Sequence, residues 1–164
     1  MIKELKNYIL SNFRTIFLFE GVKNKKRLNY KDFKLIKFKK YQSIKDKNVL
    51  FLLNADKKKR FQNKNCFFVL YFKKKVVSSG WMHEGTKWNL LEIDKEIDIK
   101  NKILLYDFFT LKKFRNRGFY SKILKLIKNL DTSKKFWIYC LANNHSSKKG
   151  IEKSNFNLIK TIRK

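Results

Sequence analysis

The order of hydrophobic and polar residues along the chain predicts several strands, which differ in how many faces are apolar. Residues 33–41 ("FKLIKFKKY") alternate apolar and basic positions, which predicts a strand with one face in water. Residues 66–72 ("CFFVLYF") and 103–111 ("ILLYDFFTL") are apolar on both faces, as is typical of central strands. Residues 73–82 predict the return strand of a hairpin, with lysines at its turn.

Two further strands are predicted near the C-terminus, and helices are predicted between the strands. The strands cover residues 135–142 ("KFWIYCLA") and 156–162 ("FNLIKTI"). Helices are predicted over the following four segments: residues 1–20, 48–62, 117–130 and 146–155. In the first and the third, apolar residues recur at helical spacing. The first of these has a basic opposite face, so it is expected to cover the core, a partner subunit or a membrane surface. Residues 89–101 fit either a strand or a loop.

This order of elements predicts an α/β (α+β) fold, in which a mixed sheet is covered by helices. The strand, helix and strand between residues 103 and 142 are expected to form a right-handed parallel crossover. A chain of 164 residues without an internal repeat or a flexible linker fits one domain over residues 1–164, beginning with an amphipathic helix over residues 1–20. That helix could also hold a homodimer together.

The charge is extreme, with 41 Lys and Arg against 13 Asp and Glu and a net charge of +28. One interpretation is a polyanionic partner, such as nucleic acid or an anionic membrane surface. The other is codon bias, because Lys, Asn, Ile and Phe have AT-rich codons and proline is absent. The lysines run through the whole chain, which favours the second interpretation. In either case the field attracts anionic ligands and repels cationic ones.

Other features of the sequence indicate the cellular compartment and whether a metal is bound. The apolar runs are shorter than the roughly 20 residues of a membrane span, and no secretory signal is visible, so a cytoplasmic protein without a transmembrane segment is expected. Cys66 and Cys140 lie in apolar runs and are expected to be buried thiols. No metal-ligand spacing is present, so no metal is expected.

The loop between the strand at 103–111 and the following helix carries candidate phosphate ligands. Gly118 permits close backbone approach, and Lys112, Lys113, Arg115 and Arg117 add positive charge. The first turn of a helix has free N–H groups that attract phosphate. On these residues alone, a phosphate site and an ordinary basic turn remain equal alternatives.

Two sequence elements resemble motifs of the GNAT superfamily of N-acetyltransferases. "RNRGFY", at residues 115–120, resembles the signature Arg/Gln-x-x-Gly-x-Gly/Ala and stands between an apolar strand and a helix, as in that family. "NHSSKKGIEKSNF", at residues 144–156, resembles Asn-x-x-Ala/Ser-x-x-x-x-Glu-Lys-x-Gly-Phe. The second motif places these residues in register: Asn144, Ser147, Glu152, Lys153 and Phe156. The resemblance is specific from residue 103 to residue 156.

The resemblance implies a sheet splayed between two parallel central strands, with helices on both faces and the cosubstrate acetyl-CoA in the gap. Carried over by position, the residues expected to bind it are Phe109, Thr110, Leu111, Arg115, Asn116, Arg117, Gly118, Phe119, Tyr120, Ser121, Asn144 and Ser147. The chain departs from the family at three places. Tyr120 replaces a small residue, Asn155 replaces a glycine, and Ile151 stands where many members carry a tyrosine that acts as general acid.

Three residues are the candidate catalytic groups. Asp107 is an acid within an apolar strand, so it should be paired or have a shifted pKa, and it serves either as a general base or in an ion pair. His83 has a side chain that suits a base near neutral pH, or it is an exposed loop residue. Tyr106, like Tyr120 and Tyr139, either protonates the leaving thiolate or packs in the core.

The function predicted from the sequence is acetyl transfer from acetyl-CoA to a primary amine by direct attack on the thioester. The acceptor is expected to be a small-molecule amine, such as an amino sugar or a nucleotide-linked amino sugar, with a protein or peptide amine as the alternative. Two alternatives stay open: a basic, non-enzymatic module that binds polyanions, and a GNAT-like domain that binds CoA without catalysis. No RNA-binding signature is present, so no specific nucleic acid is expected.

Overall fold

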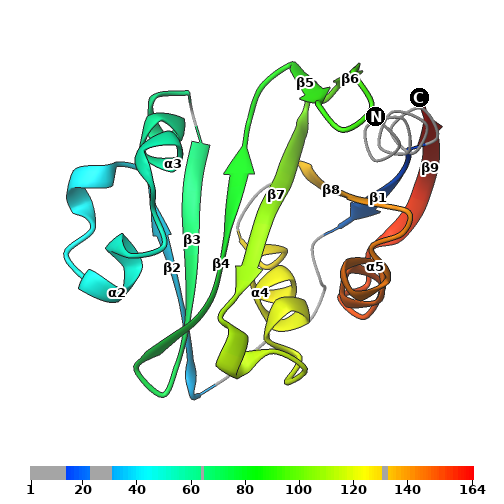
Figure 1. Ribbon diagram of the computed structural model, residues 1–164. Coiled ribbons are helices and arrows are strands. Elements are labelled where there is room, and N and C mark those ends of the chain that lie inside the picture. The colour runs from blue at the N-terminus through cyan, green and yellow to red at the C-terminus, as the bar shows by residue number, and fades with distance from the viewer. Residues whose placement is uncertain (1–13, 23–30, 64, 131–132) are drawn as a thin grey trace, which may run out of the picture.

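The computed structural model describes residues 14–22, 31–63, 65–130 and 133–164, which form one central sheet with helices against it (Figure 1). The strands are β1 (Thr15–Gly21), β2 (Phe33–Phe38), β3 (Asn65–Phe72), β4 (Lys75–His83), β5 (Lys87–Leu90), β6 (Lys95–Asp98), β7 (Lys102–Thr110), β8 (Lys135–Leu141) and β9 (Asn157–Arg163). The α-helices are α2 (Lys47–Leu50), α3 (Ala55–Lys59), α4 (Phe119–Ile127) and α5 (His145–Glu152). Short 3-10 turns are η1 (Tyr41–Ser43), η2 (Arg60–Gln62) and η3 (Lys112–Phe114).

The main sheet has seven strands in the order β2-β3-β4-β7-β8-β1-β9, and β5 and β6 form a separate hairpin. β7 and β8 are parallel, whereas the other neighbouring strands of the main sheet are antiparallel. The chain passes from β7 to β8 through α4, as the predicted crossover requires. The prediction of a mixed sheet with two parallel central strands is therefore confirmed.

Apolar side chains cover both faces of the sheet, and β3 illustrates how. Phe68 and Leu70 pack toward α4 and α5, in a core that includes Ile123 and Ile151. The alternate residue Phe67 packs toward the segment that carries α2 and α3. Because neighbouring residues of a strand point to opposite faces, a strand that is apolar throughout must be covered on both sides. Helices on both faces, as predicted, supply that cover.

Three segments differ from the predictions. The helix expected over residues 1–20 is wrong from residue 15 onward, because residues 15–21 form β1, which is paired on both edges by β8 and β9; residues 1–13 lie outside the described ranges. β-Branched and aromatic residues favour such a strand over a helix. The helix expected over residues 48–62 is broken where Asn54 caps α3 by accepting the Lys57 N–H at 2.9 Å. The ambiguous residues 89–101 contribute to the β5-β6 hairpin.

Both cysteines are buried free thiols, as predicted. Burial raises the pKa of the Cys66 thiol and raises that of Cys140 to about 11, so both stay protonated near neutral pH. Across the described ranges, the helices are too short or too polar for any of them to cross a membrane.

Candidate active site

The candidate site begins where β7 and β8 separate. Parallel pairing runs from Lys102 opposite Lys135 to Leu105 opposite Ile138, and no pair follows among the described residues. β7 nevertheless continues to Thr110 and β8 to Leu141. Figure 1 shows the two strands diverging beyond their paired half. The second half of each strand therefore has a backbone edge without a strand partner.

A cavity of about 1090 Å³ lies at this separation and reaches both faces of the sheet. On its wall, Ile138 and Cys140 belong to the core under α4 and α5. Tyr139 and Leu141, also on the wall, pack with the core around the β5-β6 hairpin. Since alternate residues of β8 point to opposite faces, the cavity passes through the sheet. Two molecules could therefore approach one point from opposite sides.

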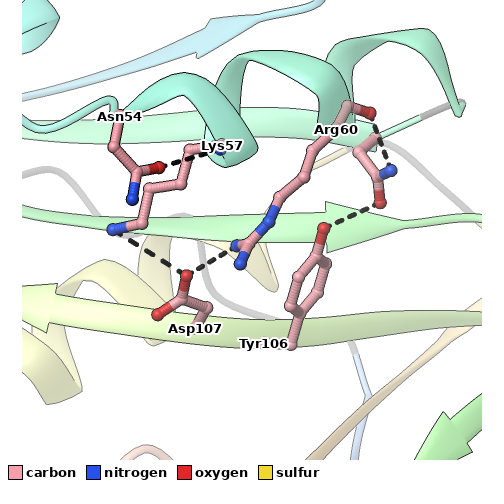
Figure 2. Close-up of polar contacts among 6 residues, drawn as sticks. Asn54, Lys57, Arg60, Tyr106 and Asp107 are labelled. Carbon is pink, nitrogen blue, oxygen red and sulfur yellow. Dashed lines mark hydrogen bonds and ion pairs between the residues drawn. The ribbon is translucent and has the colours of Figure 1, made fainter.

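A β-bulge in β7 orients the side chains at this point. Tyr106 lies opposite Trp81 and Phe109 lies opposite Ser79, so two residues of β7 face Gly80 alone. Asp107, the first of these two residues, has a φ of 47°. This extra residue interrupts the alternation of faces. Tyr106 and Asp107 consequently both point toward the side of α3 and η2 (Figure 2).

Asp107 is held in an ion-pair cluster with residues of α3 and η2. Its Oδ2 accepts a hydrogen bond from Arg60 Nη1 at 2.6 Å and lies 3.9 Å from Lys57 Nζ (Figure 2). The side chains of Arg60 and Asp107 are 32% and 37% exposed, so solvent screens the pair. The Arg60 guanidinium also lies over the rings of Trp81 and Tyr106. Asp107 is thus paired, which is one of the two arrangements that the sequence predicted.

His83 and Tyr106 share one hydrogen-bond acceptor, the side-chain oxygen of Asn65. Tyr106 Oη donates to Asn65 Oδ1 at 2.9 Å, and His83 Nδ1 lies 3.0 Å from the same atom. Asn65 Nδ2 donates to the carbonyls of Arg60 and Asn63, which fixes Oδ1 as the acceptor. A neutral His83 that donates to this oxygen carries its proton on Nδ1 and has Nε2 as the basic nitrogen. The ring also interacts with the Asn63 backbone carbonyl. Burial lowers the pKa of His83, which favours this neutral form.

The three candidate tyrosines differ in what their hydroxyls contact. The Tyr106 hydroxyl proton is committed to Asn65. Tyr139 Oη accepts from Trp88 Nε1 at 3.4 Å on the side of the β5-β6 hairpin. Tyr120 lines the cavity on the side of α4 and α5, with the Ser147 side chain beside its hydroxyl. Burial raises the pKa of each tyrosine, so all three keep their protons near neutral pH.

The turn between β7 and α4 is open to a ligand. Gly118 has a φ of 75° and caps α4 without a side-chain hydrogen bond. A Cβ built there would meet no atom within 4 Å. Within the described ranges, the backbone N–H groups of residues 117–121 have no acceptor, and the first helical bond runs from Lys122 N–H to the Gly118 carbonyl. Free N–H groups at a helix start suit an anion such as phosphate.

The other residues expected to bind acetyl-CoA fall into two groups. Asn144 and Ser147 line the cavity with Tyr120, and Asn144 Oδ1 caps α5 by accepting the Ser147 N–H at 3.1 Å. The remaining residues gather around the turn rather than on the cavity wall: Phe109, Thr110, Leu111, Arg115, Asn116, Arg117, Gly118, Phe119 and Ser121. Several backbone groups among them are already bonded, including the Phe109 carbonyl, which accepts from Ser78 Oγ at 2.9 Å. The Leu111 N–H donates to Val77, and the Thr110 carbonyl accepts from Arg115 Nε at 3.2 Å.

Sequence reasoning did not identify Asn65 or Arg60 as site residues. Asn65 is only 6% exposed. In the sequence it is simply a polar residue before an apolar run, and nothing there indicates that it is buried. Arg60 lies in a lysine-rich segment, where nothing marks one cation among many. Two tryptophans also lie in this region: Trp88 lines the cavity, and Trp81 is fully buried beneath Arg60.

Comparison with known proteins gives structural matches only. No protein-family model and no curated protein matches the sequence. A GNAT-family acetyltransferase from Colwellia psychrerythraea superposes with a TM-score of 0.59 at 13% identity, covering 98% of this chain and 59% of that one. A GCN5-related N-acetyltransferase from Sphaerobacter thermophilus gives a TM-score of 0.58 at 7% identity, covering 99% and 55%.

A conserved protein of unknown function from Staphylococcus epidermidis gives a TM-score of 0.57 at 11% identity, covering 96% of this chain and 63% of its own. The chain thus spans about six-tenths of the length of these structures. The superpositions cover nearly all of the chain, including the sheet that opens between β7 and β8. The protein therefore has the fold of the GNAT acetyltransferases.

Proposed function

We propose that this protein transfers an acetyl group from acetyl-CoA to a primary amine. The observation that carries the proposal is the cavity that crosses the sheet where β7 and β8 separate. On one side of the sheet it adjoins the starts of α4 and α5, and on the other it meets His83, Tyr106 and Asp107. A thioester and an amine entering from opposite sides would be held in reach of each other, which by itself supplies much of the rate.

The α4 side is suited to the cosubstrate. The free N–H groups of residues 117–121 would hold the diphosphate, and Arg115 and Arg117 would add charge at the same turn. The unpaired edge of β7 beyond Leu105 offers backbone groups to the amides of the pantetheine arm. The side-chain amide of Asn144 lies on the cavity wall between these two regions.

On the opposite side, His83 is the group best placed to act as base. The amine attacks the thioester carbonyl only after losing a proton, and His83 Nε2 would accept that proton directly or through one water. Asn65 holds the required tautomer by accepting from Nδ1. Asp107 instead positions Arg60. The acetyl oxygen that becomes negative would be stabilised by a backbone N–H on the free edge of β7.

We propose that Tyr120 donates the proton that the leaving thiolate needs. Ile151, at the position of the tyrosine acid implied by the family resemblance, is fully buried in the core. Tyr120 lines the cavity on the same side as the α4 turn, so its hydroxyl is near the path of the pantetheine arm. Tyr106 is less suited, because its proton is bonded to Asn65.

The test is calorimetric titration with acetyl-CoA, followed by an assay for thiol release with a panel of amines. We expect saturable binding at moderate salt, loss of binding in Gly118→Val, and amine-dependent thiol release. ATP and heparin serve as controls for the basic, polyanion-binding alternative. Binding of heparin and acetyl-CoA with equal strength, and equal loss with salt, would contradict the proposal. Binding without thiol release for any amine would leave a CoA-binding domain without catalysis.

A further inference from the structure

An exposed leucine lies at the cavity on the side of the β5-β6 hairpin. Leu91 is 84% exposed, and among the exposed large apolar side chains of the described ranges it is the one that lines the cavity. The turn that carries it is anchored, because Leu90 and Ile93 are buried in the core around the hairpin. Apolar groups exposed at a cavity are typical of ligand-binding surfaces.

Three half-buried side chains add to the apolar surface at Leu91. They are Trp88 of β5 and Tyr139 and Leu141 of β8, and all three line the same cavity. Each also packs against the core around the β5-β6 hairpin. One side of each is therefore fixed by the protein while another side faces the cavity. These three residues and Leu91 are called the apolar wall below.

Trp88 connects the apolar wall to the proposed base. The centroid of its ring lies 5.1 Å from that of His83 and 4.6 Å from that of Tyr106. Its Nε1 donates to Tyr139 Oη at 3.4 Å, so an apolar group that covers the indole ring leaves no indole N–H without a partner. A ligand whose amine reacts at His83 would have its next atoms beside Trp88.

The charged side chains of the cavity are largely neutralised by one another. Four carboxylates and three lysine or arginine side chains line it, in a chain whose net charge is +28. Asp107 is already paired with Arg60, and Lys87 Nζ lies 2.7 Å from Glu96 Oε1. The cavity therefore lacks the excess of positive charge that an anionic ligand would need, and the apolar wall is the larger source of binding energy on this side.

We propose that the apolar wall binds the hydrocarbon body of the acceptor, so that the acceptor is a primary amine with an aliphatic chain or an aromatic ring. The inference rests on the proposed function, because it names the acceptor class of that site. The amine lies at His83, the first carbons lie beside Trp88, and the end of the body covers Leu91. Covering this leucine removes apolar surface from water on both partners, which stabilises the complex. This class is more apolar than the amino sugars considered from the sequence.

The experiment measures how binding and turnover respond to the length of the apolar body. The acceptors are alkylamines of two to six carbons and 2-phenylethylamine, with ethanolamine and glucosamine as polar amines. Binding is measured by calorimetry in the absence and in the presence of CoA, and kcat/KM is measured by thiol release from acetyl-CoA. Because each methylene that the wall covers stabilises the complex, we expect affinity to rise about two- to fourfold with each added carbon.

The variant is Leu91→Ala and the control is Phe51→Ala. Phe51 is 88% exposed, as Leu91 nearly is, but it does not line the cavity. Neither substitution removes a buried side chain, so both variants should fold. We expect Leu91→Ala to lower the affinity and the kcat/KM for hexylamine, each relative to ethylamine, about fivefold. Phe51→Ala should leave both ratios unchanged.

Three results would overturn the inference: an affinity that does not rise with chain length, glucosamine binding as tightly as hexylamine, or unchanged ratios in Leu91→Ala. Failure of the proposed function gives a different result. In that case alkylamines bind according to their length and depend on Leu91, yet no amine releases thiol from acetyl-CoA. If only the acceptor assignment is wrong, thiol is released by amines whose kcat/KM depends neither on chain length nor on Leu91.

Discussion

Tyr106 and Asp107 are neighbours in β7, yet both side chains point to the same face of the sheet (Figure 2). The positive φ of Asp107 produces this arrangement, and it places one hydroxyl and one carboxylate on the acceptor side of the cavity. Without the bulge, Asp107 would point toward α4 and α5, where a carboxylate would have to be buried among apolar side chains.

The first prediction concerns the charge of Asp107. Asparagine tolerates positive φ better than most residues, so Asp107→Asn should keep the bulge and remove only the ion pair with Arg60. Because that pair is about one-third exposed, we expect the free energy of unfolding to fall by less than ~1 kcal/mol. The acetyl-CoA dissociation constant should not change. A loss of kcat in Asp107→Asn larger than that in His83→Gln would identify Asp107, and not His83, as the base.

The second prediction is a pH dependence that originates at His83. The base must be neutral, and burial lowers the pKa of His83 from its ordinary value of 6.5. The acidic limb of the kcat profile should therefore have its midpoint below pH 6.5, and His83→Gln should lose the limb along with about 10²-fold of kcat. His145→Gln, which changes the only other histidine of the chain, is the control. A limb that persists in His83→Gln would exclude this role.

The lowered pKa of His83 also makes the free energy of unfolding depend on pH. Between the lowered pKa and 6.5 the unfolded chain binds more protons at His83 than the folded chain does. The contribution of His83 to the free energy of unfolding is therefore complete above pH 6.5, falls as the pH drops through the folded-state pKa, and is constant below it. Chemical denaturation of the wild type and His83→Gln across that window measures the difference.

The third prediction is that Asn65 acts by positioning His83 and Tyr106. Asn65→Ala removes the acceptor that the half-buried Tyr106 hydroxyl and His83 Nδ1 share, so we expect a loss of about 1–3 kcal/mol of stability. It should also lower kcat more than it changes the dissociation constant of acetyl-CoA, because His83 loses its fixed tautomer. Asn65→Asp would place a carboxylate beside Nδ1 and should raise the pKa of His83, moving the acidic limb of kcat to higher pH. An unmoved limb in a folded Asn65→Asp protein would contradict the positioning role.

The parts of this site that could be read from the sequence are those encoded locally. Gly118 could be assigned because it stands between an apolar strand and an amphipathic helix, and its φ of 75° fits that assignment. Asn155, which replaces the glycine of the second motif, has a φ of 59°, a conformation that asparagine tolerates better than most residues. Both residues act through their own backbone, so a short window contains the whole signal.

The parts that could not be read depend on distant residues. The bulge at Asp107 arises from the pairing of β7 with β4, and no residue type in "LLYDFFT" marks it. The hydrogen bond of Tyr106 to Asn65 joins residues 41 positions apart.

The fourth prediction distinguishes steric clash from backbone strain when a side chain is added at Gly118, in the β7–α4 turn. No atom lies within 4 Å of a Cβ built on Gly118, so Gly118→Ala causes no clash within the described protein. Its positive φ should still cost about 1–2 kcal/mol of stability. If the turn holds a diphosphate, the methyl group would also occupy the space where the ligand approaches the backbone. We therefore expect a loss of acetyl-CoA affinity that Asn116→Ala, another alanine at positive φ, does not reproduce to the same extent.

The fifth prediction concerns the contact between Tyr120 and Gly150, where α4 and α5 meet. Replacing glycine by alanine within a helix normally stabilises a protein by roughly 0.5–1 kcal/mol. At Gly150, however, the new Cβ would overlap Cδ1 of Tyr120, so the ring or α5 must move, and overpacking of this kind costs about 1–3 kcal/mol. Gly150→Ala should therefore destabilise the wild type and stabilise a Tyr120→Ala variant. The melting temperatures of the four proteins in this double-mutant cycle measure the reversal of sign, and equal effects in both backgrounds would mean that the two residues are not in contact.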